Sequence, residues 1–299
     1  MKTKVETFDV INERALSFLE NRDFLSAQKL FRKNVKQNPC HVSFNNMGVF
    51  YIFEGMELPN GKILRARKLG MKYLGKAEVC QKSNLTFSAL GDVFFENKDY
   101  KEASRYFSQA CGLKCDYASM YNLALSFYRQ ELYKEALKWF EKALEVCENA
   151  DYDRVFEAYL FSLLQIDKKM CREKLSHLLE TNIAPMDIDT FVLAYLCDEL
   201  QAAERQIEYY FKHFSLDLEE TAMAFDCLFK LNKREEAKKY LELQVESLNG
   251  YDYNVQPEIQ RLKKVFSDDE YRKNIASSFR YIRPLIKQCC YYGCKKHNN

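Results

Sequence analysis

The chain has 299 residues, a formal net charge of +2 at pH 7, 47% hydrophobic residues and 29% charged residues. This length is enough for two ordinary domains or one long repeat array, and the apolar content excludes global disorder. The nearly balanced charge gives no overall bias toward nucleic acid or an anionic membrane. Only 9 Gly and 5 Pro punctuate the chain, which favours helices over many short strands.

The first ten residues, MKTKVETFDV, contain no apolar run, so no signal peptide is predicted. No stretch of about 18 apolar residues occurs, so no membrane span is predicted. We therefore expect a cytoplasmic protein. In such a reducing compartment the 11 Cys, which are irregularly spaced, are expected to be free thiols and mostly small core residues.

Two stretches of the chain align with a fixed offset of 33 residues. LGDVFFENKDYKEASRYFSQA begins at Leu90, and LALSFYRQELYKEALKWFEKA begins at Leu123. In the second half of each stretch, a small residue is followed four positions later by a large apolar residue and then by another small one. These spacings place all three side chains on one face of a helix. A period of about 34 residues with this pattern predicts stacked helical hairpins.

The same pattern recurs along the chain and defines about seven hairpins over residues 1–255, with weaker matches after residue 150. Its three positions are Ala27, Phe31 and Asn34; Gly70, Leu74 and Ala77; Ala103, Phe107 and Ala110; Ala136, Phe140 and Ala143; Cys171, Leu175 and Leu178; Ala203, Ile207 and Tyr210; and Ala237, Leu241 and Gln244. The second hairpin is longer than the others, and Gly55, Pro59 and Gly61 predict a loop there.

The first helix of each hairpin carries its own pattern, in which a small residue is followed three positions later by an aromatic one. Gly48, Gly91 and Ala124 are the small residues in the segments FNNMGVFYIF, LTFSALGDVFF and MYNLALSFY. With the second-helix pattern, these segments resemble the tetratricopeptide repeat family, although Phe87 and Met120 replace its usual tryptophan. The resemblance is specific over residues 85–148. It implies an all-α, right-handed superhelical solenoid of antiparallel helix pairs.

The end of the chain departs from this period. Residues 256–286 are expected to form a helical cap of two helices that separate near Ser267, whose hydroxyl is a candidate cap for the second helix. Residues 287–299 are expected to be a flexible tail that contains Cys and Lys.

The resemblance also predicts where a ligand would bind, because the first helices of such a stack line its concave groove. The predicted groove residues are Asn46, Val49, Phe53, Phe95, Tyr121, Asn122, Leu125, Tyr128 and Arg129. Asn46 and Asn122 stand two residues before the small position, where a carboxamide can both donate to and accept from an extended peptide backbone. The other interpretation is that asparagine is merely tolerated on an exposed helix. Tyr121 and Tyr128 are the predicted aromatic anchors.

Chaperone-docking members of the family hold a terminal carboxylate with basic residues on neighbouring first helices. The matching positions here are Asn12, Leu85 and Ala89, which carry no positive charge. We therefore expect a non-catalytic scaffold or adaptor that binds another peptide or protein segment in the groove. No cofactor, metal or nucleic-acid partner is expected.

Other functions stay open at this point. A peptide-sensing regulatory protein could use the same repeats. Arg172 and His177 resemble a short motif of HEPN-type ribonucleases, in which such a pair would serve phosphate binding and proton transfer. The tail offers thiols and an imidazole as possible zinc ligands, in Cys289, Cys290, Cys294 and His297, or cysteines beside basic residues for acylation or contact with an anionic surface.

Overall fold

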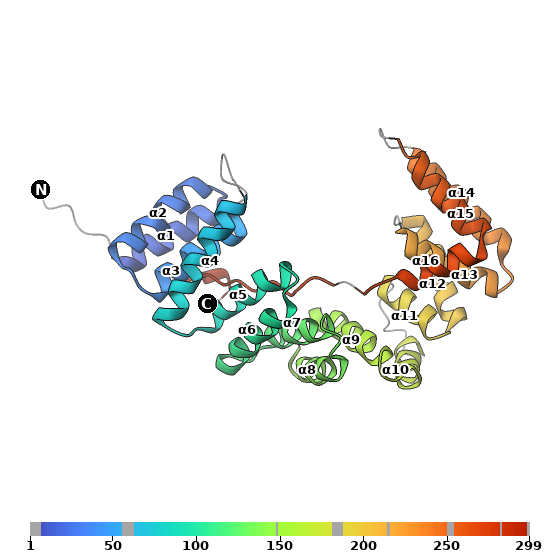
Figure 1. Cartoon of the computed structure of the whole chain (residues 1–299), viewed down its shortest axis with the longest axis horizontal. Helices are drawn as coiled ribbons and strands as arrows, with labels where there is room; N and C mark the ends of the chain where they lie inside the picture. The colour runs from blue at the N-terminus through green and yellow to red at the C-terminus, as the bar shows by residue number, and fades with distance from the viewer. Residues whose placement is uncertain are drawn as a thin grey trace, which may run out of the picture. The chain divides into compact units, whose positions relative to one another are not determined.

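The computed structural model describes residues 7–55, 63–147, 149–180, 188–213, 216–249, 254–281 and 283–297. All regular secondary structure in these residues is helical, and consecutive helices pair as antiparallel hairpins (Figure 1). The predicted all-α solenoid of helix pairs is therefore confirmed. None of the described helices is long and apolar enough to cross a membrane. The predicted loop at Pro59 and Gly61 lies outside the described residues.

The chain divides into two compact units. Unit 1 comprises Met1–Glu148 together with Leu285–Asn299, and unit 2 comprises Asn149–Pro284. This division differs from the predicted boundaries at residues 255 and 286, because the last residues pack on the first repeats rather than on the helices that precede them.

The described residues of unit 1 form four helix pairs. They are α1 (Phe8–Glu20) with α2 (Phe24–Gln37), α3 (His41–Val49) with α4 (Ile63–Cys80), α5 (Asn84–Glu96) with α6 (Tyr100–Leu113), and α7 (Tyr117–Tyr128) with α8 (Tyr133–Val146). A π-helical turn at Phe50–Glu54 extends α3, and a short 3₁₀ turn lies at Lys295–His297.

Where the structure describes unit 2, it has three further pairs and two final helices. They are α9 (Asn149–Leu164) with α10 (Lys168–Glu180), α11 (Ile188–Leu196) with α12 (Leu200–His213), α13 (Leu218–Lys230) with α14 (Arg234–Asn249), then α15 (Gln256–Ser267) and α16 (Asp269–Ser278). The last helix ends at Ser278, so the predicted helical cap is shorter than residues 256–286. The cap of α16 is Asp268, which accepts from the N–H of Tyr271; Ser267 instead donates to a carbonyl of its own helix.

Five of the hairpin turns share a left-handed backbone conformation at a residue other than glycine. Arg22, Lys98, Glu131, Asp198 and Asn232 have φ between 60° and 64° and stand between the two helices of their hairpins. This left-handed conformation is costly for a residue with a Cβ. Its recurrence in both units shows that the α11–α12 and α13–α14 hairpins of unit 2 turn in the same way as three hairpins of unit 1.

The small-large-small pattern forms the contact between paired helices, as predicted. Its residues on α2, α4, α6, α8 and α12 are buried, and so are Cys171 and Leu175 on α10. Helices approach so closely that a Cβ added to Gly91 would lie 2.6 Å from the ring of Phe107. The last hairpin departs from the pattern, because Tyr240 is buried there and Leu241 is only half-buried.

Candidate functional site

The first helices of unit 1 all contact one segment of the same chain, which has no regular structure before its final 3₁₀ turn. This segment, residues 285–297, runs in an elongated path beside α3 and α5, drawn in red in Figure 1. Its polar contacts come from α1, α3, α5 and α7 and from the residues that cap them. We call this contact surface of the four helices the inner face. Four of the nine predicted groove residues, Asn46, Val49, Phe53 and Asn122, lie beside the segment on this face.

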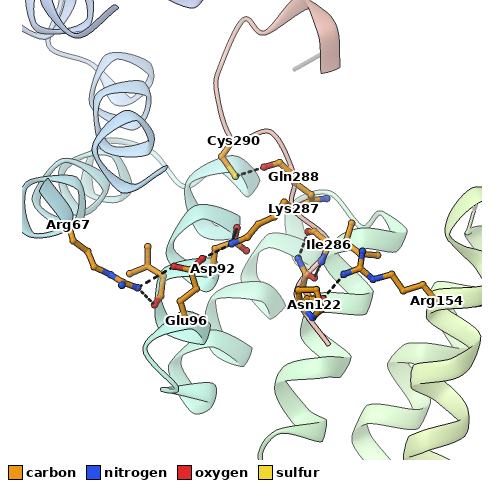
Figure 2. Close-up of polar contacts among 11 residues, drawn as sticks. Arg67, Asp92, Glu96, Asn122, Arg154, Ile286, Lys287, Gln288 and Cys290 are labelled. Carbon is orange, nitrogen blue, oxygen red and sulfur yellow. Dashed lines mark hydrogen bonds and ion pairs between the residues drawn. The ribbon is translucent and has the colours of Figure 1, made fainter. Parts of the chain in front are cut away.

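At one end of the inner face, a single side chain binds both backbone groups of one segment residue. The side-chain oxygen of Asn122 accepts from the N–H of Ile286 at 2.8 Å, and its amide nitrogen donates to the carbonyl of Ile286 at 2.9 Å (Figure 2). Asn122 is 1% exposed and lies on α7. Because only backbone groups are recognised, this contact fixes the position of the segment without selecting a side chain.

At the other end of the inner face, Asn46 repeats the same arrangement. It accepts from the N–H of Tyr292 at 2.8 Å and donates to the carbonyl of that residue at 3.1 Å. Asn12 donates to the same carbonyl at 3.0 Å and accepts from Asn46 at 2.9 Å. The neighbouring Asn45 donates to the carbonyl of Cys290 at 2.7 Å. A network of carboxamides from α1 and α3 therefore fixes the far end of the segment.

Between these ends the inner face is acidic. Lys287 of the segment reaches Glu96 at 2.7 Å and Asp92 at 3.5 Å (Figure 2). Its ammonium lies 5.4 Å from the ring centroid of Phe53. Burial raises the pKa of Asp92 to about 7, and the repulsion of Glu96 adds to the increase, whereas Lys287 acts in the opposite direction. Lys287 is therefore the neighbouring cation that favours the ionised form of the buried Asp92 carboxyl.

The segment also contributes apolar side chains to the core of unit 1. Tyr291 is 6% exposed and stacks on Phe31, with ring centroids 5.9 Å apart and planes inclined by 12°. Cys290 and Cys294 are buried in the same cluster, beside residues of α1, α2 and α3 such as Val49. The segment is thus packed into the protein and not only hydrogen-bonded to its surface.

The structure distributes the predicted groove residues between two environments. Asn46, Asn122, Val49 and Phe53 lie beside the segment, as described above. The other five pack within the solenoid: Tyr121 is fully buried in edge contact with Phe140, Leu125 is fully buried, Tyr128 is in edge contact with Tyr133, Phe95 is in edge contact with Tyr100, and Arg129 donates to the hydroxyl of Tyr100. Their role in ligand binding stays a prediction.

Sequence reasoning did not assign a binding role to Asn12 or identify the segment itself. One signal for Asn12 is its register, because it stands three residues before the buried Ala15, as Asn45 stands three residues before Gly48. The segment has no comparable signal, because its contacts are mostly to backbone groups and join residues up to 280 positions apart.

The cysteines proposed for zinc binding or acylation, Cys289, Cys290 and Cys294, belong to the 285–297 segment itself, whereas the pair proposed for ribonuclease chemistry lies in unit 2. Arg172 and His177 are both on α10, where five positions correspond to a rotation of about 140°, so they point from different sides of the helix. Arg172 pairs with Glu199, and His177 is exposed. Among the side chains that the structure describes, no group of three or more His, Cys, Asp or Glu is arranged to hold a metal ion.

Comparisons with known proteins agree with this architecture. Residues 88–153 match the tetratricopeptide repeat family. A tetratricopeptide repeat protein from Parabacteroides merdae ATCC 43184 superimposes with a TM-score of 0.58 at 15% identity, covering 87% of this chain and 98% of that one. The pilF protein of Pseudomonas aeruginosa has a TM-score of 0.50 at 15% identity, covering 86% of this chain and 96% of its own.

A third structure has the same fold. PilW, a type IV pilus biogenesis factor, has a TM-score of 0.50 at 12% identity, and the match covers 87% of this chain and all 100% of that chain. At such identities these likenesses show the fold alone. No curated protein sequence matches the chain significantly.

Proposed function

Because the chain is a tetratricopeptide-repeat protein, we propose that it is a protein-interaction scaffold whose inner face binds an extended peptide segment of a partner protein. The fold supports protein partners in general, since such repeats present long surfaces to other chains. The observation that carries the proposal is the pairing of Asn46 and Asn122 with the backbone of Tyr292 and Ile286. A face that holds one extended segment in this way has the groups needed to hold another.

The geometry fits an extended ligand better than a helical one. In a helix the backbone N–H and C=O groups are occupied by each other, so neither carboxamide could pair with them. The two paired residues are six positions apart, which corresponds to about 20 Å of extended chain. A partner segment must therefore be free of regular structure over at least this length.

Selection from a random 12-residue peptide display library on the full-length chain tests the proposal. Affinities of the selected peptides are then measured by fluorescence anisotropy for the wild type and for Asn46→Ala and Asn122→Ala. Each substitution removes two hydrogen bonds, worth about 2 kcal/mol together, so we expect roughly 30-fold weaker binding. Asn97→Ala is the matched control, because Asn97 is exposed at the end of α5, outside the inner face. Equal affinities for all four proteins would show that the peptides bind elsewhere.

A further inference from the structure

The 285–297 segment shows which side chains the inner face can select, in addition to the backbone it holds. The two carboxamide contacts fix the register, so every segment side chain between Ile286 and Tyr292 meets a defined surface. The first selective position is Lys287, whose ammonium lies between Asp92, Glu96 and Phe53. The Asp92 side chain is 3% exposed, so a segment without a cation here would cover this carboxyl without the neighbouring charge that favours its ionised form.

The second selective position lies four residues later. Tyr291 stacks on Phe31 and is almost fully buried, whereas the preceding Cys290 is 2% exposed and leaves no room for a large side chain. An aromatic ring at this site buries a large apolar area, which is the main source of affinity in peptide recognition. The segment therefore offers a small residue and then an aromatic residue to the apolar cluster that Phe31 of α2 forms with residues of α1 and α3.

The third selective position is Gly293, which has φ of +77°. A Cβ here would lie 3.0 Å from the side-chain nitrogen of Asn12, and the backbone conformation itself disfavours any other residue. Beyond it, Lys295 pairs with Glu13, but its side chain is 80% exposed, so this pair contributes little.

The segment competes from within the same chain. A segment tethered close to its site has an effective local concentration on the order of millimolar. A free partner displaces it only when the ratio of the partner's concentration to its dissociation constant exceeds the same ratio for the segment. The apparent affinity of a partner is therefore its intrinsic affinity multiplied by the fraction of molecules in which the inner face is open. Since every selective position is filled by the protein's own residues, the structure shows the occupied state.

We propose that the 285–297 segment is an internal competitor that occupies the inner face until a partner displaces it, and that the partner segment is extended and carries the same pattern. That pattern is a basic residue, a small residue three positions later, then an aromatic residue, and a glycine two positions after the aromatic. This inference rests on the proposed function, because it assumes that the inner face binds segments from other proteins.

The test uses the full-length chain and a released variant, Lys287→Glu with Tyr291→Asp. The variant places carboxylates against Asp92 and in the apolar site of Phe31, but leaves every residue of the four helices unchanged. The probe is a fluorescein-labelled synthetic peptide with the sequence of residues 283–297, RPLIKQCCYYGCKKH, kept reduced. Anisotropy titrations give its affinity for each protein. Amide exchange of residues 286 and 292 independently reports whether the internal segment is bound.

We expect the probe to bind the released variant at least tenfold more tightly than the wild type. A probe with Glu in place of Lys287, or Ser in place of Tyr291, should bind the released variant at least tenfold more weakly than the unaltered probe. The protein variant Lys295→Glu is the matched charge control, because it makes the same change at an exposed position of the segment. It should bind the unaltered probe with an affinity within about twofold of that of the wild type.

The outcomes separate the two proposals. If the probe binds the wild type and the released variant equally well, the segment is not a competitor, although the inner face binds peptides. If the released variant binds all three probes equally well, the proposed pattern is wrong. If no probe binds either protein while the exchange data show the segment released, the proposed function itself fails together with this inference.

Discussion

Asn122 and Ile286 are joined by two hydrogen bonds. The side-chain oxygen of Asn122 accepts from the backbone N–H of Ile286 at 2.8 Å, and its side-chain nitrogen donates to the backbone carbonyl of Ile286 at 2.9 Å. A carboxamide has the same donor and acceptor as a peptide group, so Asn122 replaces one residue of a neighbouring strand. Asn46 does the same for Tyr292. The segment is thus held in the manner of a strand on a scaffold made only of helices.

Asn122→Ala should release the segment locally. The alanine leaves the N–H and C=O of Ile286 without their partners, and we expect the amide of Ile286 to exchange with solvent at least tenfold faster, as followed by hydrogen exchange with mass spectrometry. Asn97→Ala, at an exposed position after α5, should leave this exchange rate unchanged. An unchanged rate in Asn122→Ala would mean that the apolar contacts of the segment alone keep it in place.

Gly91→Ala should destabilise unit 1, since the new Cβ would lie 2.6 Å from the ring of Phe107. Overpacking of this kind costs about 1–3 kcal/mol, more than the gain of up to about 1 kcal/mol in helix propensity. Gly75→Ala on α4 is the matched control, because nothing lies within 4 Å of its added Cβ, and it should stabilise by about 0.5–1 kcal/mol. Urea unfolding followed by the fluorescence of Trp139, on α8 of the same unit, measures both.

These close approaches were the part of the fold that the sequence predicted best. A small residue facing a large one, as Gly91 faces Phe107, reflects local helix geometry and repeats with the period of the hairpins, so it is visible in the sequence. The amide positions Asn46 and Asn122 could be predicted for the same reason. The chain's own segment could not, because its contacts join residues far apart and its sequence has no period.

The hairpin turns show a second limit of the sequence pattern. Lys98 and Glu131 adopt a left-handed conformation that glycine or asparagine normally favours, so their residue types do not predict it. The conformation is imposed by the packing of the two helices that each turn joins. Local propensity is overridden here by tertiary contacts, and only the structure shows that the turns of both units are alike.

Lys98→Gly should therefore stabilise unit 1. Lys98 has φ of +64°, a conformation that costs about 1–2 kcal/mol for a residue with a Cβ and that glycine adopts without this cost. Glycine also increases the chain entropy of the unfolded state, which offsets about 0.5–1 kcal/mol of the gain. The expected net gain is about 0.5–1 kcal/mol in the free energy of unfolding, measured by Trp139 fluorescence in urea. Lys98→Val, with a branched Cβ, should instead destabilise by about 1 kcal/mol. If both variants lower the stability equally, the lysine side chain matters more than the backbone.

Asp92 makes the stability of unit 1 depend on pH. Burial raises the pKa of this carboxyl to about 7, well above its value of about 4 in the unfolded chain. Between these two values the folded protein binds more protons at this site than the unfolded protein does. The contribution of Asp92 to the free energy of unfolding therefore falls as the pH rises from about 4 to 7, and it is constant outside this window.

Asp92→Asn should remove that dependence, since an amide does not ionise but can still accept a hydrogen bond from Lys287. We expect the variant to gain stability relative to the wild type as the pH rises from 5 to 8, by about 3 kcal/mol, because the wild type alone must keep a buried carboxylate charged. Urea titrations followed by Trp139 fluorescence give the difference in the free energy of unfolding between the wild type and Asp92→Asn at pH 5 and at pH 8. Glu102→Gln is the control, because Glu102 is a half-exposed carboxyl on the same unit whose pKa is lowered, chiefly by its hydrogen bond from Arg105, so it stays ionised across this pH range. A stability difference between wild type and Asp92→Asn that is the same at pH 5 and pH 8 would show that Asp92 is already ionised at the lower pH.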